Sequence, residues 1–304
     1  MSERPRILVG ADQSEHGDEA IRQADAWVRR HGGDFLVCHV APRALGAHPF
    51  FPQLVAEEAI AQPESERNLE VAVRDRVARL TRRSPEEVRT IIESGEPAAE
   101  LVRAAQREGA TLVVVGSHDH GAGRITILGN VAESVVRHAP CSVLVARPHS
   151  PTGRVLVGTD LSEAALASVE LAAEHARLAG ARLTVACCLE PRLEAVQDMT
   201  NLGASYGFMQ EEYADLRRQS EEELARQLDA VGAPGATMIL DGEPAPALLR
   251  AASETDPDLL VLGARGASGL ERLMIGRITE KVVRGARCSV LVVRPARRVH
   301  ESKA

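Results

Sequence analysis

Arg6-Ile-Leu-Val-Gly-Ala-Asp-Gln-Ser-Glu15 returns later in the chain as Arg154-Val-Leu-Val-Gly-Thr-Asp-Leu-Ser-Glu163, an offset of 148 residues. Gly95-Glu-Pro97 returns as Gly242-Glu-Pro244, and Cys141-Ser-Val-Leu-Val-Ala-Arg-Pro148 returns as Cys288-Ser-Val-Leu-Val-Val-Arg-Pro295, both offset by 147. An offset this constant and this long indicates two copies of a complete domain, since solenoid repeats are much shorter. The turn-rich segment 148–153 separates the copies, so we expect domains at residues 1–149 and 150–304.

Each copy alternates short apolar runs with segments of helical spacing. Arg6 to Gly10 is a short apolar run between turn residues, which predicts a buried strand. Ser14 then predicts the N-cap of a helix that ends near His31-Gly-Gly33. The same reading gives strands and helices along the rest of the first copy, listed here in order: strand 35–40, helix 68–80, strand 88–92, helix 97–107, strand 112–115, helix 131–137 and strand 142–145.

The second copy repeats this order. Its expected strands and helices are strand 155–157, a helix ending near Gly180, strand 183–187, helix 211–228, strand 237–240, a helix after Pro244, strand 259–262, a helix after Gly276 and strand 289–293. Strands that alternate with helices predict an α/β fold with two tandem, doubly wound parallel sheets. Ligands of such sheets bind beyond the carboxyl ends of the strands, where the strand order reverses.

Composition limits the function classes. The 304 residues are 44% hydrophobic and 26% charged, which is typical of a globular protein. The formal net charge of −7 argues against a nucleic-acid partner, because phosphate-backbone binding needs a basic face. No apolar run is long enough for a membrane span, and the first six residues contain no apolar signal region, so we expect a cytoplasmic protein. The five cysteines form no CxxC pair and are interpreted as small buried hydrophobes.

A glycine-rich loop follows the fourth strand of the second copy. Leu262-Gly-Ala-Arg-Gly266 leads through Gly276 into a helix. Glycines directly after a strand let backbone N–H groups approach a phosphate, and the free N-terminal amides of the helix favour an anion. Arg265 and Arg277 add positive charge. A surface turn followed by an ordinary helix start is the alternative. For Asp160, which closes the first strand, the alternatives are a ribose or adenine contact and a role in capping the next helix.

The pattern Gly263-x-x-Gly266, nine residues and Gly276 resembles the ATP-binding signature of the universal stress proteins, and the likeness extends over both copies. The resemblance implies a universal stress protein fold and a bound adenine nucleotide (ATP, ADP or AMP), with or without Mg²⁺. It places the adenosine near Thr159, Asp160 and Leu189. It places the phosphates near Leu262, Gly263, Arg265, Gly266, Gly276, Arg277, Ile278 and Thr279.

The chain departs from the family pattern in both copies. Arg277 stands where the family has Ser or Thr, which removes a hydroxyl but adds a cation. In the first copy Asp119 replaces the second glycine, and its carboxylate disfavours a triphosphate. Asn130 follows Gly129 in place of Ser or Thr. We therefore expect nucleotide mainly in the second copy. The weaker site of the first copy would comprise Ala11, Asp12, Val40, Gly116, Gly129 and Asn130.

Three functional hypotheses remain from the sequence. The first is a nucleotide-binding regulatory module of the stress response, not an enzyme. The second is an enzyme, such as an ATP-consuming ligase or transferase on a related fold or a weak ATP hydrolase, although no P-loop or adenylation motif is present. The third is a nucleotide-independent scaffold that binds an unidentified protein through the segments after the second strands, which contain Phe50, Phe51, Tyr206 and Phe208. The resemblance also implies that segments 143–145 and 290–292 pair within the chain as a pseudo-dimer, with further homodimerisation open. His118-Asp-His120 is interpreted as a loop rather than a metal site.

Overall fold

The structure is a computed structural model that describes residues 4–41, 52–117, 128–190, 205–264 and 275–295. The chain divides into two compact units. The first unit comprises residues 1–148 with 294–304, and the second comprises residues 149–293. Within the described parts of the chain, no helix combines the length and apolar character required to cross a bilayer.

The first unit contains five parallel strands. In sequence order its elements are β1 (Arg6–Gly10), α1 (Glu15–His31), β2 (Asp34–Ala41), α2 (Pro52–Thr81), a short 3-10 turn η1 (Pro85–Glu87), β3 (Arg89–Ser94), α3 (Pro97–Glu108), β4 (Leu112–Gly116), α4 (Asn130–His138) and β5 (Ser142–Ala146). The strands are arranged in the order β3-β2-β1-β4-β5, and neighbouring strands run parallel.

The second unit repeats this topology. Its elements are β6 (Arg154–Thr159), α5 (Glu163–Ala179), β7 (Arg182–Leu189), α7 (Ser205–Ala230), β8 (Gly235–Asp241), α8 (Pro244–Thr255), β9 (Leu259–Gly263), α9 (Arg277–Gly285) and β10 (Ser289–Val293). The strand order β10-β9-β6-β7-β8 is again parallel throughout. The prediction of tandem doubly wound α/β domains is therefore confirmed.

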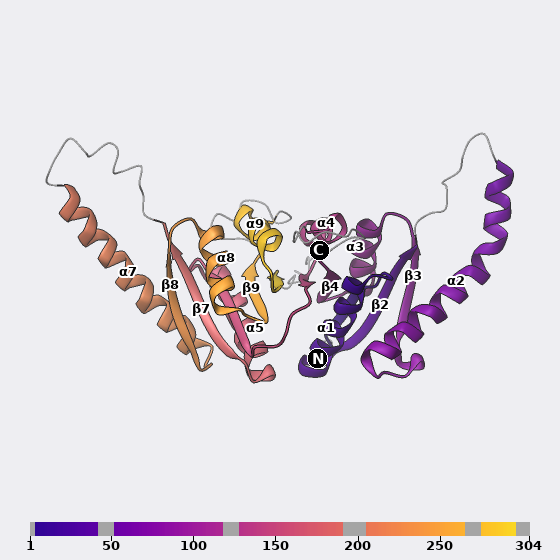
Figure 1. Ribbon diagram of the computed structural model, residues 1–304, viewed down its shortest axis with the longest axis horizontal. Coiled ribbons are helices and arrows are strands. Elements are labelled where there is room, and N and C mark those ends of the chain that lie inside the picture. The colour runs from indigo at the N-terminus through magenta and orange to yellow at the C-terminus, as the bar shows by residue number, and fades with distance from the viewer. Residues whose placement is uncertain (1–3, 42–51, 118–127, 191–204, 265–274, 296–304) are drawn as a thin grey trace, which may run out of the picture. The chain divides into compact units, whose positions relative to one another are not determined.

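Helices cover both faces of each sheet (Figure 1). In the first unit α1 and α2 contact each other and pack on one face, while α3 and α4 form the second pair. In the second unit the pairs are α5 with α7 and α8 with α9. Because both faces are covered, the strands are continuous apolar runs, and Leu8, Val9, Leu156 and Val157 are wholly buried.

The strand order reverses beside β1 and beside β6, although all strands run parallel. β1 lies between β2 and β4, and β6 lies between β7 and β9. The connections that leave these neighbouring strands cross to opposite faces of the sheet, which opens a crevice at their carboxyl ends. The loops that carry the candidate site residues start at these strand ends.

Candidate functional site

A cavity of about 610 Å³ lies at the carboxyl edge of the first unit's sheet. Its lining comes from the ends of β1, β2 and β4 and from the first turns of α1, α3 and α4. Among the described residues these are Gly10, Ala11, Asp12, Gln13, Gly17, Cys38, His39, Val40, Pro97, Leu101, Val115, Gly116 and Val131. The volume is in the range of small-molecule sites. The cavity brings together Ala11, Asp12, Val40 and Gly116, which the sequence analysis placed in one site.

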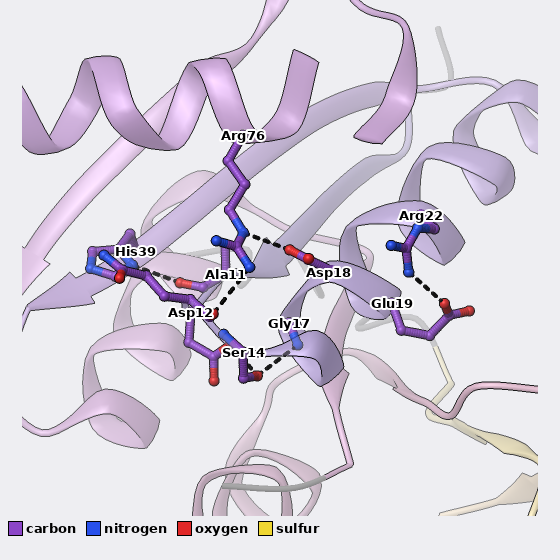
Figure 2. Close-up of polar contacts among 10 residues, drawn as sticks. Ala11, Asp12, Ser14, Gly17, Asp18, Glu19, Arg22, His39 and Arg76 are labelled. Carbon is purple, nitrogen blue, oxygen red and sulfur yellow. Dashed lines mark hydrogen bonds and ion pairs between the residues drawn. The ribbon is translucent and has the colours of Figure 1, made fainter. Parts of the chain in front are cut away.

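Hydrogen bonds fix the loop after β1 to its neighbours (Figure 2). The amide of Ala11 donates to the Cys38 carbonyl oxygen at 2.9 Å, and His39 Nδ1 donates to the Ala11 carbonyl oxygen at 2.7 Å. Asp12 Oδ1 accepts from the amide of Ser14 at 2.9 Å and from its hydroxyl at 2.5 Å. The Ser14 hydroxyl oxygen in turn accepts from the Gly17 amide and caps α1. Asp12 thus supports a helix cap and lines the cavity at once.

Two glycines allow this loop to pack closely. A Cβ atom at Gly17 would overlap Asp12 Oδ1. A Cβ atom at Gly116 would lie 2.6 Å from the carbonyl oxygen of His16 in the first turn of α1. Real Cβ atoms do not approach other atoms so closely. A side chain at position 116 would therefore require the backbone of α1 to shift, and one at position 17 would require Asp12 to move.

Arg76 reaches the same loop from α2 (Figure 2). Its Nε lies 2.6 Å from Asp18 Oδ1 on α1, and its Nη2 donates to the Gln13 carbonyl oxygen at 3.0 Å. Both side chains of the ion pair are largely covered, with 30% of Arg76 and 18% of Asp18 exposed. The guanidinium therefore joins α2, α1 and the cavity loop.

The helices after the glycine loops, α4 and α9, begin without a side-chain cap. Gly129 and Gly276 occupy their N-cap positions and offer no side-chain acceptor, whereas Ser14 and Ser162 cap α1 and α5. The first amides of a helix have no intrahelical acceptor and form the positive end of its dipole. An anion at either helix start would supply the missing acceptor.

In the second unit the loop after β6 has different supports. Thr159 is buried, and its hydroxyl donates to Gln227 Oε1 at 3.2 Å and accepts from the amide of Leu161 at 3.0 Å. Leu161 has a φ of 63°, which is uncommon for a side chain of this size. Asp160 Oδ1 accepts from Ser162, but Asp160 is exposed whereas Asp12 is half-buried.

Ala165 occupies the position of Gly17 in the second unit. A Cβ atom at Gly17 would overlap Asp12 Oδ1, so the first unit leaves space for its carboxylate that an alanine would take. Ser162 still caps α5 through the Ala165 amide. Asp160 therefore takes part in the capping arrangement that the sequence analysis raised as an alternative.

Two cysteines stand where the first cavity has His39 and Val40. Gly10 pairs with Cys38 in the first sheet and Gly158 with Ala186 in the second, so Cys187 and Cys188 are the counterparts of His39 and Val40. Burial raises the pKa of the Cys187 thiol to about 11, with Asp160 adding to the effect, and burial raises that of Cys188 to about 12. Both thiols are therefore neutral near pH 7. Leu189, predicted for the adenosine, is buried at the end of β7.

The start of α9 holds the phosphate-side residues that the structure describes. The Thr279 hydroxyl donates to the Gly263 carbonyl oxygen at 2.8 Å, and Gly276 N donates to Ala264 O at 2.8 Å, which joins the helix start to the end of β9. Leu262 is buried, while Arg277 and Ile278 are exposed. Arg277 has no ion pair with a described residue. Arg265, Gly266, His118 and Asp119 lie outside the described residues.

Several residues of the two candidate sites were not predicted from the sequence. Gln13, Gly17, His39, Pro97, Leu101 and Val131 line the first cavity, and Arg76 and Gln227 support the two loops. Pattern signals existed for Gly17, because it stands in the first turn of a capped helix, and for Pro97, which starts one. Over the described ranges, no group of three or more His, Cys, Asp or Glu side chains is placed to hold a metal ion.

A sequence model of the universal stress protein family matches residues 3–147 and again residues 151–294. This chain belongs to that family. It carries the family's domain twice, as the repeat predicts.

Relatives with two domains and with one domain both resemble this universal stress protein. One from Mycolicibacterium smegmatis is 25% identical over 304 residues, which cover 95% of this chain and 97% of the relative. One from Thermus aquaticus is 34% identical over 144 residues, which cover 46% of this chain and 97% of the relative. The solved structure of a universal stress protein from Archaeoglobus fulgidus matches with a TM-score of 0.61 and 22% identity, covering 95% of this chain and 98% of that one. The structural likeness establishes the fold.

Proposed function

We propose that this protein is a regulatory module that binds adenine nucleotides without efficient turnover. The observation that carries the proposal is the pairing of two features in each unit. A carboxylate loop follows the first strand, and a helix with no side-chain cap follows the fourth. These strands are neighbours in the sheet, so both features belong to the same edge. A nucleotide has matching parts, because its ribose hydroxyls donate hydrogen bonds and its phosphates accept them.

The residues present fit such a ligand. In the first unit Asp12, His39 and Val40 would surround the nucleoside, and the first turn of α4 from Asn130 would face the phosphates. In the second unit Thr159, Asp160 and Leu189 would take the nucleoside part. Gly263, Gly276 and the turn Arg277–Thr279 would take the phosphates. Bound Mg²⁺ would neutralise part of the charge of a triphosphate.

The two units differ in ways that concern different parts of the nucleotide. On its nucleoside side the first unit has a cavity and a half-buried Asp12, whereas Asp160 of the second unit is exposed. The second has the more favourable phosphate side, because Arg277 is exposed at the start of α9 and Gly266 stands where the first unit has Asp119. We therefore propose that ATP occupies mainly the second unit. Adenosine, which carries no charge, should lose this preference.

Three measurements test the proposal. Mass spectrometry of small molecules released from the purified full chain should find adenine nucleotide. Isothermal titration should give unequal sites for ATP, and hydrogen exchange should show which unit fills first by comparing segments 10–17 and 158–165. Two equally tight ATP sites would contradict the asymmetry.

The same protein sample tests two alternatives to the proposed function, namely ATP hydrolysis and a nucleotide-independent scaffold. Incubation with labelled ATP should release little product over many binding lifetimes, whereas steady release would establish a hydrolase. If neither ATP nor adenosine alters exchange in either segment, the nucleotide proposal fails and a nucleotide-independent scaffold becomes the better account.

A further inference from the structure

The loop after β1 is held from outside the cavity as well as from within it. Inside, His39 donates to the Ala11 carbonyl oxygen and Asp12 accepts from Ser14. Outside, Arg76 donates to the Gln13 carbonyl oxygen. Ala11 is thus held from β2, Asp12 is held by Ser14, the N-cap residue of α1, and Gln13 is held from α2.

Arg76 does not line the cavity, so it would act on a ligand only through the loop. Its position is itself fixed, because Asp18 in the first turn of α1 holds the Nε atom at 2.6 Å. A hydrogen bond from a charged donor is stronger than a neutral one. The carbonyl of Gln13, next to Asp12, therefore has a strong and well-placed partner.

The second unit lacks this arrangement. Val77 and Leu224 are both wholly buried and are related by the repeat offset of 147, which makes Glu223 the counterpart of Arg76. Leu166 replaces Asp18, and Glu223 pairs with Arg226 on its own helix. In the loop after β6, the Thr159 hydroxyl instead donates a hydrogen bond to Gln227 of α7, and Leu161 has a positive φ.

We propose that Arg76 is a positioning residue that presets the Asp12 loop for the nucleoside part of a nucleotide in the first unit. This inference rests on the proposed function. A loop already held in its binding geometry loses less conformational freedom when the ligand binds, so affinity rises without a new ligand contact. Asp18 is the partner that holds Arg76 in place.

The test uses Arg76→Gln in the full chain with adenosine as the probe. Adenosine is uncharged, so a loss of affinity cannot reflect a lost attraction for phosphate. Occupancy is followed by hydrogen exchange in segment 10–17, with segment 158–165 as the internal control. We expect adenosine to bind the first unit about tenfold more weakly, as the loss of one charge-assisted hydrogen bond implies. Segment 158–165 should be unchanged.

Three further variants separate positioning from general destabilisation. Arg76→Lys keeps the charge and should restore part of the affinity. Arg74→Gln is the matched control, because Arg74 bonds Glu70 and Thr90 and does not reach the loop. In an Asp12→Asn background, Arg76→Gln should have little further effect, since coupled residues are not additive.

Different outcomes would contradict the positioning role of Arg76 and the proposed nucleotide binding of the first unit. If adenosine fails to protect segment 10–17 of the wild type, the proposed function of the first unit fails and this inference falls with it. If the wild type is protected and Arg76→Gln binds adenosine equally well, the inference alone is overturned. Equal losses in the Asp12 and Asp12→Asn backgrounds would also overturn it, because Arg76 would then act independently of the loop carboxylate.

Discussion

At the scale of single residues, Gly17 leaves the space that the Asp12 carboxylate occupies. A side chain at position 17 would overlap Asp12 Oδ1. The half-buried Asp12 thus occurs with glycine at this position, and the exposed Asp160 occurs with Ala165. This difference is invisible in a motif comparison, since both copies read Asp-x-Ser-Glu.

Gly17→Ala should weaken adenosine binding in the first unit by about tenfold, because Asp12 must move away from the added Cβ atom and out of its place in the cavity lining. Hydrogen exchange of segment 10–17 at increasing adenosine concentration measures the change. Ala165→Gly is the matched variant in the second unit and should leave segment 10–17 unaffected. Unchanged protection in Gly17→Ala would show that Asp12 does not contact the nucleoside.

The buried thiols give the protein a sensitivity to alkaline pH. Burial, with Glu93 adding to it, raises the pKa of the Cys38 thiol to about 12, compared with 9.0 in its ordinary state. Between these values the unfolded chain loses a proton that the folded chain keeps. The free energy of unfolding therefore falls as pH rises from about 9 to about 12, by at most about 1.4 kcal/mol per pH unit for each such thiol.

Cys38→Ala should make this decline shallower. Urea unfolding of the wild type and the variant between pH 8 and pH 10.5 gives the difference, and groups other than Cys38 cancel in the comparison. Below pH 8 the variant should be less stable than the wild type by a constant amount, because the smaller side chain leaves space in the core. If the free energies of unfolding of the wild type and Cys38→Ala changed in parallel from pH 8 to pH 10.5, the Cys38 thiol would not have a raised pKa.

At the scale of elements, the start of α9 combines an uncapped first turn with the cation of Arg277. The start of α4 has the same geometry but carries Asn130. The helix dipole favours an anion at both starts, and only α9 adds a full positive charge. The difference between the two elements is therefore electrostatic rather than conformational.

Arg277→Gln should reduce ATP affinity in the second unit several-fold while leaving adenosine affinity there almost unchanged, since the lost attraction concerns the phosphates alone. Titration calorimetry of the wild type and Arg277→Gln measures the affinities for ATP and for adenosine. Raised salt should reduce the effect of the substitution on ATP affinity, because salt screens the attraction between Arg277 and the phosphates. Asn130→Arg is the converse variant and should strengthen ATP binding in the first unit. An equal loss for ATP and adenosine would place Arg277 away from the phosphates.

Strand and helix identities were predictable because they depend on local patterns. The apolar runs at Arg6–Gly10 and Leu112–Gly116 mark buried strands, and Ser14 and Pro97 mark helix starts. The lengths of α2 and α7 were underestimated: α2 begins at Pro52 rather than near Asn68, and α7 begins at Ser205 rather than near Glu211. Pro63 lies inside α2, where proline normally ends or kinks a helix, so the local pattern favours a shorter one.

At the scale of the whole molecule, duplication preserved the topology more closely than the contacts at the strand ends. The sequence predicted which loops meet, since parallel strands bring their carboxyl ends to one edge. It could not predict the supports, because Arg76 meets Gln13 across 63 residues and Gln227 meets Thr159 across 68. Such pairs depend on where one helix packs on another, which no short pattern encodes. The two copies are therefore alike in fold and separately adapted in their loops.

Gly129 and Gly276 leave the first amides of their helices without a side-chain acceptor. A bound phosphate would then accept hydrogen bonds from the first turn of the helix, as the Ser14 hydroxyl does at the start of α1. Occupancy would then slow amide hydrogen exchange in the first turn of α4 or α9, so the backbone of the helix would carry the ligand state.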